Sequence, residues 1–448
     1  MSSKSVPTKS VRLWLMMFLQ YAIWGAWLPV APTYFQAQRP LGLAIDGNQL
    51  GILFMLMPLA SLFMSPWMGR LADRRFQAQK MLGILHCFST IFIFLLALQT
   101  TFIGSVICLG LHCVVFAPTV ALSNSVALAN LEDPKGQFAS IRVGGTFGWI
   151  FSGLVLSLIR SKFNLEVRSD LFMLAAFMNL CLALLSFTLP KTPPTTSHLN
   201  ALTASSNQKY KNPLDAISLF KNFQFLAFMI VAFIVCTQFE SYYMHTSGFL
   251  TAPKLDSLRG YLPEAAYAGA TDGIGIPLAQ VSMIMTISQV SEVFMMLLLP
   301  FIIKRLGIAL TLWIGIIAWP LRFAIFAFLP TASAVIPAMA LHGLCIACFI
   351  VAGSVYVEQV ASPEIRASAQ GLYSSVTMGI GRVAGAMFAG YSLKQNTLPL
   401  PARVSLPGGT ELDHLVAWGP LFAIPCGLTL AAAVAFPILF FYCPKVKV

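Results

Sequence analysis

Polar side chains occur inside long apolar stretches of this sequence, where a charge is costly unless it is paired or functional. The clearest case is a set of four polar residues at helical spacing on one face: Ser282, Thr286, Gln289 and Glu292. Glu292 precedes Lys304 by twelve residues, about 18 Å along a helix, which predicts a position near the middle of a bilayer. A carboxyl group there can be neutral or charged, as proton coupling requires, or it can form a static ion pair.

A second polar set combines a cation, a hydroxyl and an indole. Arg142, Thr146 and Trp149 stand at i, i+4 and i+7, so they share one helical face. This combination suits a polyhydroxylated or heterocyclic ligand, with the indole as a stacking surface. The alternative is an arginine that reaches toward the membrane surface beside a packed tryptophan.

A similar stripe lies near the start of the chain. Gln20, Trp24 and Trp27 have the same spacing, and Gly25 allows a neighbouring helix to approach closely. Asn124 is an isolated amide in a later apolar stretch. We interpret Gln20, Trp24 and Asn124 as candidate substrate-binding residues, while packing and interhelical hydrogen bonding remain open for each.

Three more charges occur in the second half of the chain. Glu240, followed by Tyr243 at i+3, and the arginines Arg322 and Arg382 all lie within apolar stretches. We predict a cluster of Glu240, Arg322 and Arg382, whose charges balance when Glu292 joins it. The network either takes part in proton coupling or permanently fixes the packing of this half.

The elements that carry these residues are predicted from composition. Of the 448 residues 57% are hydrophobic and only 10% are charged, and the mean hydropathy is +0.78, which indicates lipid as the main solvent. Twelve apolar stretches are long enough to span a bilayer as helices. They lie at about 11–36, 47–69, 81–100, 102–128, 139–160, 169–190, 223–250, 278–303, 307–329, 332–360, 366–393 and 415–442.

Topology follows from the basic residues. The first stretch is too long for a signal-peptide core, so we interpret it as the first span. If the N-terminus is cytoplasmic, most lysines and arginines fall in cytoplasmic segments, which predicts cytoplasmic N- and C-termini. The net charge of +12 is therefore a topology signal and does not indicate nucleic acid binding. The Cys345 and Cys348 pair lies in an apolar stretch without further ligands, so we predict no metal site.

The spans divide into two halves. A polar, Pro-, Thr- and Ser-rich segment at 191–222 separates an N-terminal half at 1–190 from a C-terminal half at 223–448. We predict an all-α integral membrane protein with the two six-helix halves of the major facilitator superfamily. Asp73 and Arg74 follow the second span, and Asp73 is a candidate cytoplasmic latch with Arg366, or a simple loop charge.

Five segments carry a family resemblance. They are FLQYAIWGAWL (18–28), SIRVGGTFGW (140–149), IMTISQVSEVF (284–294), AWPLRFAIFAF (318–328) and GSVYVEQVASPEIRASAQG (353–371). Through them the chain resembles the nucleoside:proton symporter family of the major facilitator superfamily along nearly its whole length. The resemblance implies uptake of nucleosides across the bacterial inner membrane, driven by the proton gradient.

The resemblance carries over residue by residue. The family's arginine and threonine fall on Arg142 and Thr146, and its glutamine and glutamate on Gln289 and Glu292. Four positions depart from the family: Glu240 and Tyr243 replace a glutamine and an asparagine, Ala347 replaces an acidic residue, and Arg382 replaces an uncharged one. These departures indicate a rewired site, with coupling at Glu292 or Glu240, and they leave another hydroxylated solute open.

The predicted function is secondary active transport by alternating access, with a nucleoside and a proton as partners, no cofactor and a monomeric state by analogy. Symport, uniport and efflux of another sugar-like solute are the alternatives, and a non-transporting sensor is a remote one. The sequence contains no phosphate-binding loop or nucleophile motif, so we predict no enzymatic activity.

Overall fold

A computed structural model describes residues 8–74, 76–163, 168–193, 213–363, 365–405 and 411–441. The chain divides into two compact units. The first contains residues 1–34, 41–43 and 56–209, and the second contains 35–40, 44–55 and 210–448. The change between residues 209 and 210 falls inside the polar segment predicted to join the two halves.

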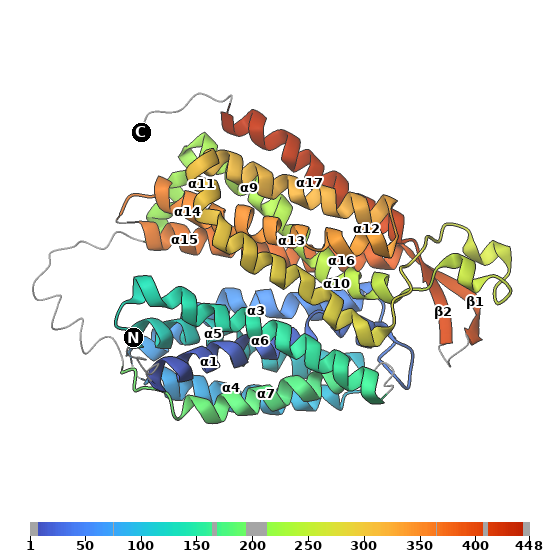
Figure 1. The fold of residues 1–448 in the computed structure, drawn as a ribbon, viewed down its shortest axis with the longest axis horizontal. Coiled ribbons are helices and arrows are strands. Elements are labelled where there is room, and N and C mark those ends of the chain that lie inside the picture. Colours follow the sequence, from blue (N-terminus) through green and yellow to red (C-terminus); the bar gives the residue numbers. More distant parts are fainter. Residues whose placement is uncertain are drawn as a thin grey trace, which may run out of the picture. The chain divides into compact units, whose positions relative to one another are not determined.

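The first unit is a bundle of long helices (Figure 1). It contains α1 (Thr8–Trp27), α4 (Ala78–Ala97), α5 (Phe102–Asn130), α6 (Pro134–Phe163) and α7 (Asp170–Ser186). The two units share α2 (Ala31–Gln36) and α3 (Gly47–Arg74). The Thr101 hydroxyl caps α5 by accepting a hydrogen bond from the Gly104 backbone N–H. Arg160 at the end of α6 forms a bidentate ion pair with Asp170 at the start of α7.

The second unit is also mainly helical. Its principal helices are α9 (Phe223–Thr237), α10 (Phe239–Thr251), α11 (Leu278–Phe328), α14 (Ala352–Val360), α15 (Arg366–Ser374), α16 (Gly381–Gln395) and α17 (Trp418–Phe441). Shorter helical elements are η1 (Pro213–Lys221), η2 (Leu255–Leu258), η3 (Glu264–Tyr267), α12 (Ala332–Ala338) and α13 (Leu341–Gly343). Two π-helical turns, η4 (Leu344–Val351) and η5 (Ser375–Ile380), complete this unit together with the strands β1 (Thr397–Ser405) and β2 (Glu411–Val416).

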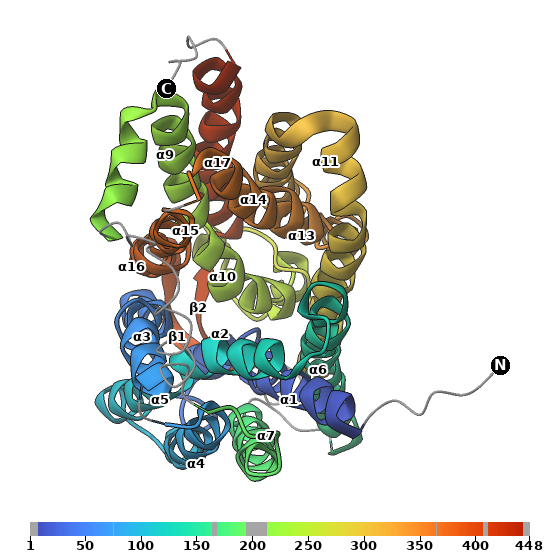
Figure 2. The ribbon, with the colours of Figure 1, turned by 90° about the vertical axis from the view of Figure 1, so that its left-hand side faces the viewer.

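Two of the predicted spans lie within the continuous element α11. Gly307 has φ +75° and ψ 166°, and the chain reverses there, so α11 forms a helical hairpin (Figure 2). Glycine adopts positive φ without the steric cost that a Cβ imposes. The reversal therefore requires no loop, and Gly307 lies two residues after Arg305.

Length and composition support a multi-pass membrane protein. Nine segments of the described residues are long and apolar enough to cross a bilayer, and one of them is the whole α11 hairpin. Large apolar side chains on these segments are exposed, including Leu297 at 74% and Ile103 at 70%. Such surfaces are stable against lipid and not against water. The number of twelve spans stays a prediction.

Two segments between spans in the second unit, at 251–277 and 394–414, pack against each other. Neither is long enough to form a domain by itself. The strands β1 and β2 pair antiparallel, and Leu258, Leu262 and Leu415 form a buried apolar cluster that joins the hairpin to η2 and η3 (Figure 1). Each loop is short, but together they bury enough apolar surface to form a small packed subdomain.

Candidate functional site

The second unit contains a buried ion pair between α10 and α16. The helix of span seven is interrupted at Gln238, and Glu240 lies in the first turn of α10 just after this break. Its Oε1 accepts a hydrogen bond from Nε of Arg382 at 2.6 Å, and Glu240 is fully buried. Arg382 is the second residue of α16, directly after the π-helical turn η5. Its guanidinium carbon also lies 4.7 Å from the centre of the Phe239 ring.

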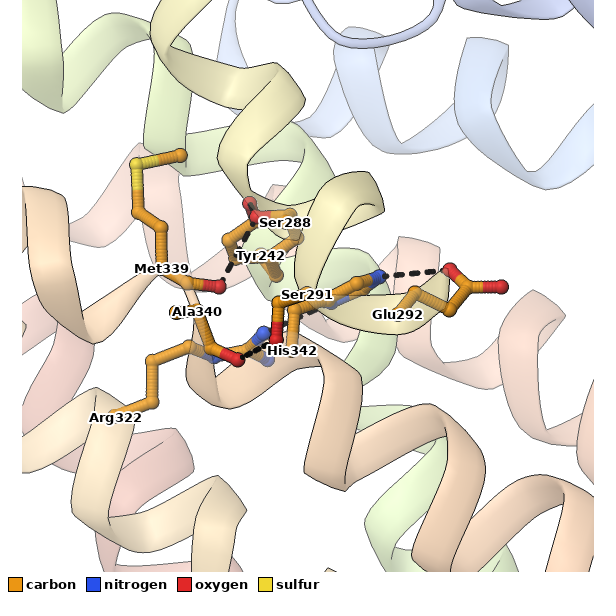
Figure 3. A network of polar contacts seen from close by, with 8 residues as sticks. All are labelled: Tyr242, Ser288, Ser291, Glu292, Arg322, Met339, Ala340 and His342. Atoms are coloured by element: carbon orange, nitrogen blue, oxygen red, sulfur yellow. Dashed lines mark hydrogen bonds and ion pairs between the residues drawn. The ribbon is translucent and has the colours of Figure 1, made fainter. Parts of the chain in front are cut away.

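A second chain of contacts joins Arg322 to Glu292 through a histidine (Figure 3). Nη1 of Arg322 lies 3.0 Å from Nδ1 of His342. Because a guanidinium only donates, this Nδ1 accepts, and a neutral His342 therefore carries its proton on Nε2. Nε2 lies 3.9 Å from Oε2 of Glu292. The proton-bearing nitrogen of the imidazole thus faces the carboxylate.

Aromatic rings surround the buried arginine of this chain. The guanidinium carbon of Arg322 lies 4.3 Å from the Tyr242 ring centre and 4.8 Å from that of Trp319, and Arg322 is completely buried. The Tyr242 hydroxyl pairs with Ser288 at 2.6 Å, and Ser288 also donates to the Met339 backbone carbonyl. Cation–π contacts stabilise a guanidinium that has left water. They position Arg322 without neutralising its charge.

The predicted cluster of Glu240, Arg322 and Arg382 is resolved into these two pairings. Glu240 contacts Arg382, whereas Arg322 donates a hydrogen bond to His342. His342 was missed in the sequence, although a histidine inside an apolar span was a signal that could have identified it. Both arrangements involve π-helical turns, because η4 follows His342 and η5 precedes Arg382. Such turns shift side-chain directions and occur often at functional sites.

Three members of the polar stripe on α11 lie in the interior of the unit. Ser282, Thr286 and Gln289 are buried, while the apolar Leu297 on the same helix is exposed. Glu292 is 27% exposed, more than any other member of its contact chain. Oε1 of Gln289 and Oγ of Ser282 are buried atoms without a protein hydrogen-bond partner. The unsatisfied atoms make this stripe a candidate surface for a polar ligand.

Tyr243 and Ala347 complete the predicted positions of the second unit. Tyr243 is buried, and its ring lies 5.2 Å from Phe239 and 6.3 Å from His342, centre to centre. Ala347 is fully buried within η4. The position at which the family resemblance implies an acidic residue is therefore buried and apolar here.

The first unit brings together the predicted cation and indoles. The guanidinium carbon of Arg142 lies 3.9 Å above the Tyr21 ring, and the Trp24 and Trp149 rings are 6.3 Å apart. Thr146 is partly exposed, as are Arg142 and Trp149. A Cβ on Gly25 would lie 2.8 Å from Trp149, so this glycine does permit the expected close approach of α1 and α6. Tyr21 was not predicted from the sequence.

Two other candidates in the first unit have buried polar atoms without a partner. Nε1 of Trp24 and Oδ1 of Asn124 have no protein hydrogen bond. Gln20 differs, because its amide bonds to both Thr119 and His86 and its side chain is fully buried. Nε1 of Trp24 can therefore donate a hydrogen bond to a ligand, and Oδ1 of Asn124 can accept one. Gln20, in contrast, is part of an internal network.

The predicted latch is described only in part. Arg366 pairs with Glu358 at 3.3 Å, and both side chains are about half exposed. The side chains of Asp73 and Arg74 lie outside the described residues, so their contact with Arg366 stays a prediction.

An exposed ion pair in the second unit links Asp46 to Lys394. Oδ2 of Asp46 lies 2.9 Å from Nζ of Lys394, and its Oδ1 accepts the Gln49 backbone N–H. Burial raises the pKa of Asp46, but these hydrogen bonds and the charge of Lys394 outweigh it, and the pKa lies below its usual value.

Apolar helices, an internal charge network and two helical units define a secondary transporter. Comparison of sequences agrees with this class. The family model described as "Nucleoside H+ symporter" matches residues 8–445, and the chain belongs to that family.

Relatives of known name support the assignment. The chain is 29% identical to the nucleoside permease NupG of Escherichia coli K12 over 442 residues, which cover 96% of each protein. It is also 29% identical to the xanthosine permease of the same strain over 435 residues, 95% of this chain and 94% of the permease. These relatives are permeases, so the chain is a transport protein and not an enzyme.

Solved structures show the same fold. A crystal structure of a point mutant of the nucleoside transporter NupG has a TM-score of 0.79 at 28% identity, and the match covers 97% of this chain and 100% of that one. A peptide transporter of the POT family matches with a TM-score of 0.68 at 12% identity, over 98% and 96% of the two chains. The fold is that of the major facilitator superfamily.

Proposed function

We propose that this protein couples the uptake of a nucleoside to the entry of a proton by alternating access. Membership of the nucleoside H+ symporter family and the names of its relatives support the substrate class. The observation that carries the coupling is the chain from Arg322 through His342 to Glu292.

Glu292 is the proton-coupling residue in this proposal. Glu292 retains 27% exposure, whereas Glu240 is fully buried and bound to Arg382 at 2.6 Å. A partly exposed carboxylate exchanges protons with water more readily than one enclosed in a short ion pair. Protonation of Glu292 removes its attraction to the Arg322–His342 pair, and the free energy of the two transport conformations changes with it.

Each unit contains its own candidate substrate contacts. Trp24 and Trp149 provide ring faces for a nucleobase, and Arg142, Thr146 and Asn124 provide polar groups. In the second unit Gln289 and Tyr243 are the corresponding candidates. No cofactor is involved, because the proton gradient supplies the energy. Substrate atoms that pair with Trp24 Nε1, Asn124 Oδ1 and Gln289 Oε1 would satisfy buried groups that lack partners.

Uptake by purified protein in liposomes tests the proposal. Labelled uridine and adenosine are offered with an imposed inward proton gradient to wild type, Glu292→Gln and the control Glu264→Gln, which removes an exposed carboxyl of η3. We expect gradient-driven accumulation in wild type and control, and loss of accumulation with retained exchange in Glu292→Gln. Accumulation that persists in Glu292→Gln moves the coupling to Glu240.

A second candidate substrate is another sugar-like or hydroxylated solute. Ala347, which is apolar and buried at the family's acidic position, favours this alternative. Folded protein that takes up neither nucleoside, but whose uptake of a labelled monosaccharide follows the gradient, would establish it. Accumulation under an outward gradient would indicate efflux, and equilibration without accumulation would indicate a uniporter.

The membrane context completes the proposal. We place the protein as a monomer in the inner membrane of a bacterium, with both termini in the cytoplasm. The distribution of lysine and arginine supports this orientation. Reporter fusions at the two termini and the mass of the detergent-solubilised protein test orientation and oligomeric state.

A further inference from the structure

The first unit contains a second buried polar network, which the proposed mechanism does not use. Six side chains from four helices form it, and each is 0% exposed: Gln20 of α1, His86 and Ser89 of α4, His112 and Thr119 of α5, and Asn179 of α7. The two nitrogens of His86 both take part. Nδ1 lies 2.8 Å from Oδ1 of Asn179, and Nε2 lies 3.0 Å from Oε1 of Gln20.

The orientation of Asn179 is determined by its other contacts. Its Nδ2 donates to the backbone carbonyl of Ala175 at 3.2 Å, and a carbonyl can only accept. Its Oδ1 therefore faces His86, and it also accepts from the Ser89 hydroxyl at 2.9 Å. Nδ1 of His86 must carry a proton, because it faces an atom that only accepts.

The orientation of Gln20 depends on one hydroxyl. Thr119 donates to the backbone carbonyl of Phe116 at 2.6 Å, so its oxygen accepts from Nε2 of Gln20 at 2.8 Å. This leaves Oε1 of Gln20 facing Nε2 of His86. In this arrangement both nitrogens of His86 face acceptors, and the hydrogen bonds are complete only when the imidazole carries two protons.

A neutral His86 also has a complete set of hydrogen bonds, but in another arrangement. If the Gln20 amide turns over, its Nε2 donates to the lone pair of His86 Nε2. The Thr119 hydroxyl then rotates from the Phe116 carbonyl to Gln20 Oε1. The two arrangements differ by one proton, one amide rotation and one hydroxyl rotation.

We propose that His86 is a proton-binding residue of the first unit, and that its protonation is coupled to the orientation of the Gln20 amide. This goes beyond the proposed function, because Glu292 lies in the other unit and the network needs no substrate. Gln20 is one turn before Trp24, so the amide transmits the protonation of His86 toward a candidate substrate residue.

Among the residues that the structure describes, the groups that contact His86 carry no formal charge. From α1 and α7 it meets the amides of Gln20 and Asn179, and the Phe116 ring of α5 lies 5.8 Å from it. The titratable group that faces it is His112 of α5, which is linked through Ser89 at 3.0 Å. Burial opposes a charge on His86, so the ring retains a second proton only while amide oxygens face both nitrogens.

Solid-state NMR of ¹⁵N-histidine-labelled protein in liposomes tests the proposal. The chain has 6 histidines, and His86→Asn assigns the signal. We expect His86 to change between a doubly protonated form and the neutral Nδ1–H form as the pH rises from about 3 to about 8, because burial shifts the change toward acid while the two amide oxygens oppose that shift. Gln20→Glu, which adds a carboxylate, raises the midpoint by about one pH unit, and Gln20→Met, which removes the acceptor, lowers it by about one unit.

Controls separate this coupling from general effects on folding. Gln280→Met makes the same exchange at an exposed position of α11 and leaves the midpoint unchanged. Thr119→Ser keeps the hydroxyl and also leaves it unchanged. If a Gln20 variant does not fold, Asn179→Asp replaces it and raises the midpoint. A His86 that stays in one neutral form throughout, or a midpoint that is equal in wild type and the Gln20 or Asn179 variants, overturns the proposal.

Discussion

Glu240 and Arg382 lie 142 residues apart in the sequence, and their side chains meet at 2.6 Å in the interior of one helical unit. Neither charge is tolerable alone there, because the desolvation of an unpaired ion costs several kcal/mol. The pair therefore holds α10 to α16 close to the turn η5, at positions where the family resemblance implies uncharged residues.

Removal of one partner of this pair destabilises the protein more than removal of both. We expect Arg382→Ala to cost about 3–5 kcal/mol, and Glu240→Gln combined with Arg382→Met to recover most of it. Thermal denaturation in detergent measures the stability of wild type and of both variants. Arg259→Ala, which removes an 81% exposed arginine from an ion pair, is the control. Equal losses in Arg382→Ala and Arg259→Ala would show that the buried pair contributes no specific stability.

Replacement of His342 separates its acceptor function from its volume. His342→Phe fills the space but leaves Nη1 of Arg322 without its acceptor, a loss of about 1.5–3 kcal/mol for a hydrogen bond to a charged group. We expect gradient-driven uptake to fall at least about tenfold, with a smaller loss in His342→Gln, which retains an acceptor. Uptake kinetics over a range of pH measure both variants. Equal activity of His342→Phe and wild type would exclude the histidine from coupling.

The stack of Arg142 on Tyr21 contributes to substrate affinity. A lysine at this position keeps the charge but loses the planar contact at 3.9 Å, which is worth about 0.5–2 kcal/mol. We expect KM for the transported nucleoside to rise between about twofold and thirtyfold in Arg142→Lys and to a similar extent in Tyr21→Leu, with a smaller change in kcat. Additive effects in the double variant would contradict a direct contact.

Helix packing in the first unit depends on a glycine of α6. A Cβ on Gly148 would lie 1.9 Å from the backbone oxygen of Phe18 in α1, so α1 and α6 would have to separate. We expect Gly148→Ala to destabilise the protein by at least about 1–3 kcal/mol. Gly110→Ala in α5 meets nothing within 4 Å and should be neutral or stabilising by up to about 1 kcal/mol. Thermal unfolding of Gly148→Ala and Gly110→Ala in the same detergent tests this prediction. Equal shifts of the unfolding temperature in the two variants would refute the packing argument.

The pair of Asp46 and Lys394 makes a small contribution that depends on pH. Because the pKa of Asp46 is lower in the folded protein, its contribution is complete above the usual aspartate range near 3.9 and is lost as the pH falls through the lowered value. Both side chains are almost half exposed, so solvent screening limits the effect to about 0–1 kcal/mol. We expect Asp46→Asn to unfold at a lower temperature than wild type at pH 6.5, and the difference to shrink as the pH is lowered below about 4.

Salt provides a check on this electrostatic origin. The difference between wild type and Asp46→Asn at pH 6.5 should shrink in 1 M NaCl, where the Debye length is about 3 Å. A difference that grows as the pH falls would contradict the assigned sign.

Local pattern was enough to identify several features of the site. Spacing alone predicted that Ser282, Thr286 and Gln289 share one helical face, and the sequence also predicted that Gly25 permits close helix packing. Both depend only on helical periodicity, which neighbouring residues determine. The π-helical turns η4 and η5 were not predictable in this way, because they have no distinct residue pattern and arise from packing against other helices.

The sequence by itself determined that lipid is the main solvent and that the spans are helical. It also determined which polar residues lie inside the apolar spans, because hydropathy and periodicity are local properties. The tertiary structure decided which of these residues meet. Arg322 was equally compatible with Glu240 and Glu292, and it was the rotation and height of its helix that placed it against His342. The network around His86 likewise required four helices that are distant in sequence to converge. Which side chains meet depends on how different helices pack against one another, and the residue pattern of a single helix does not contain this information.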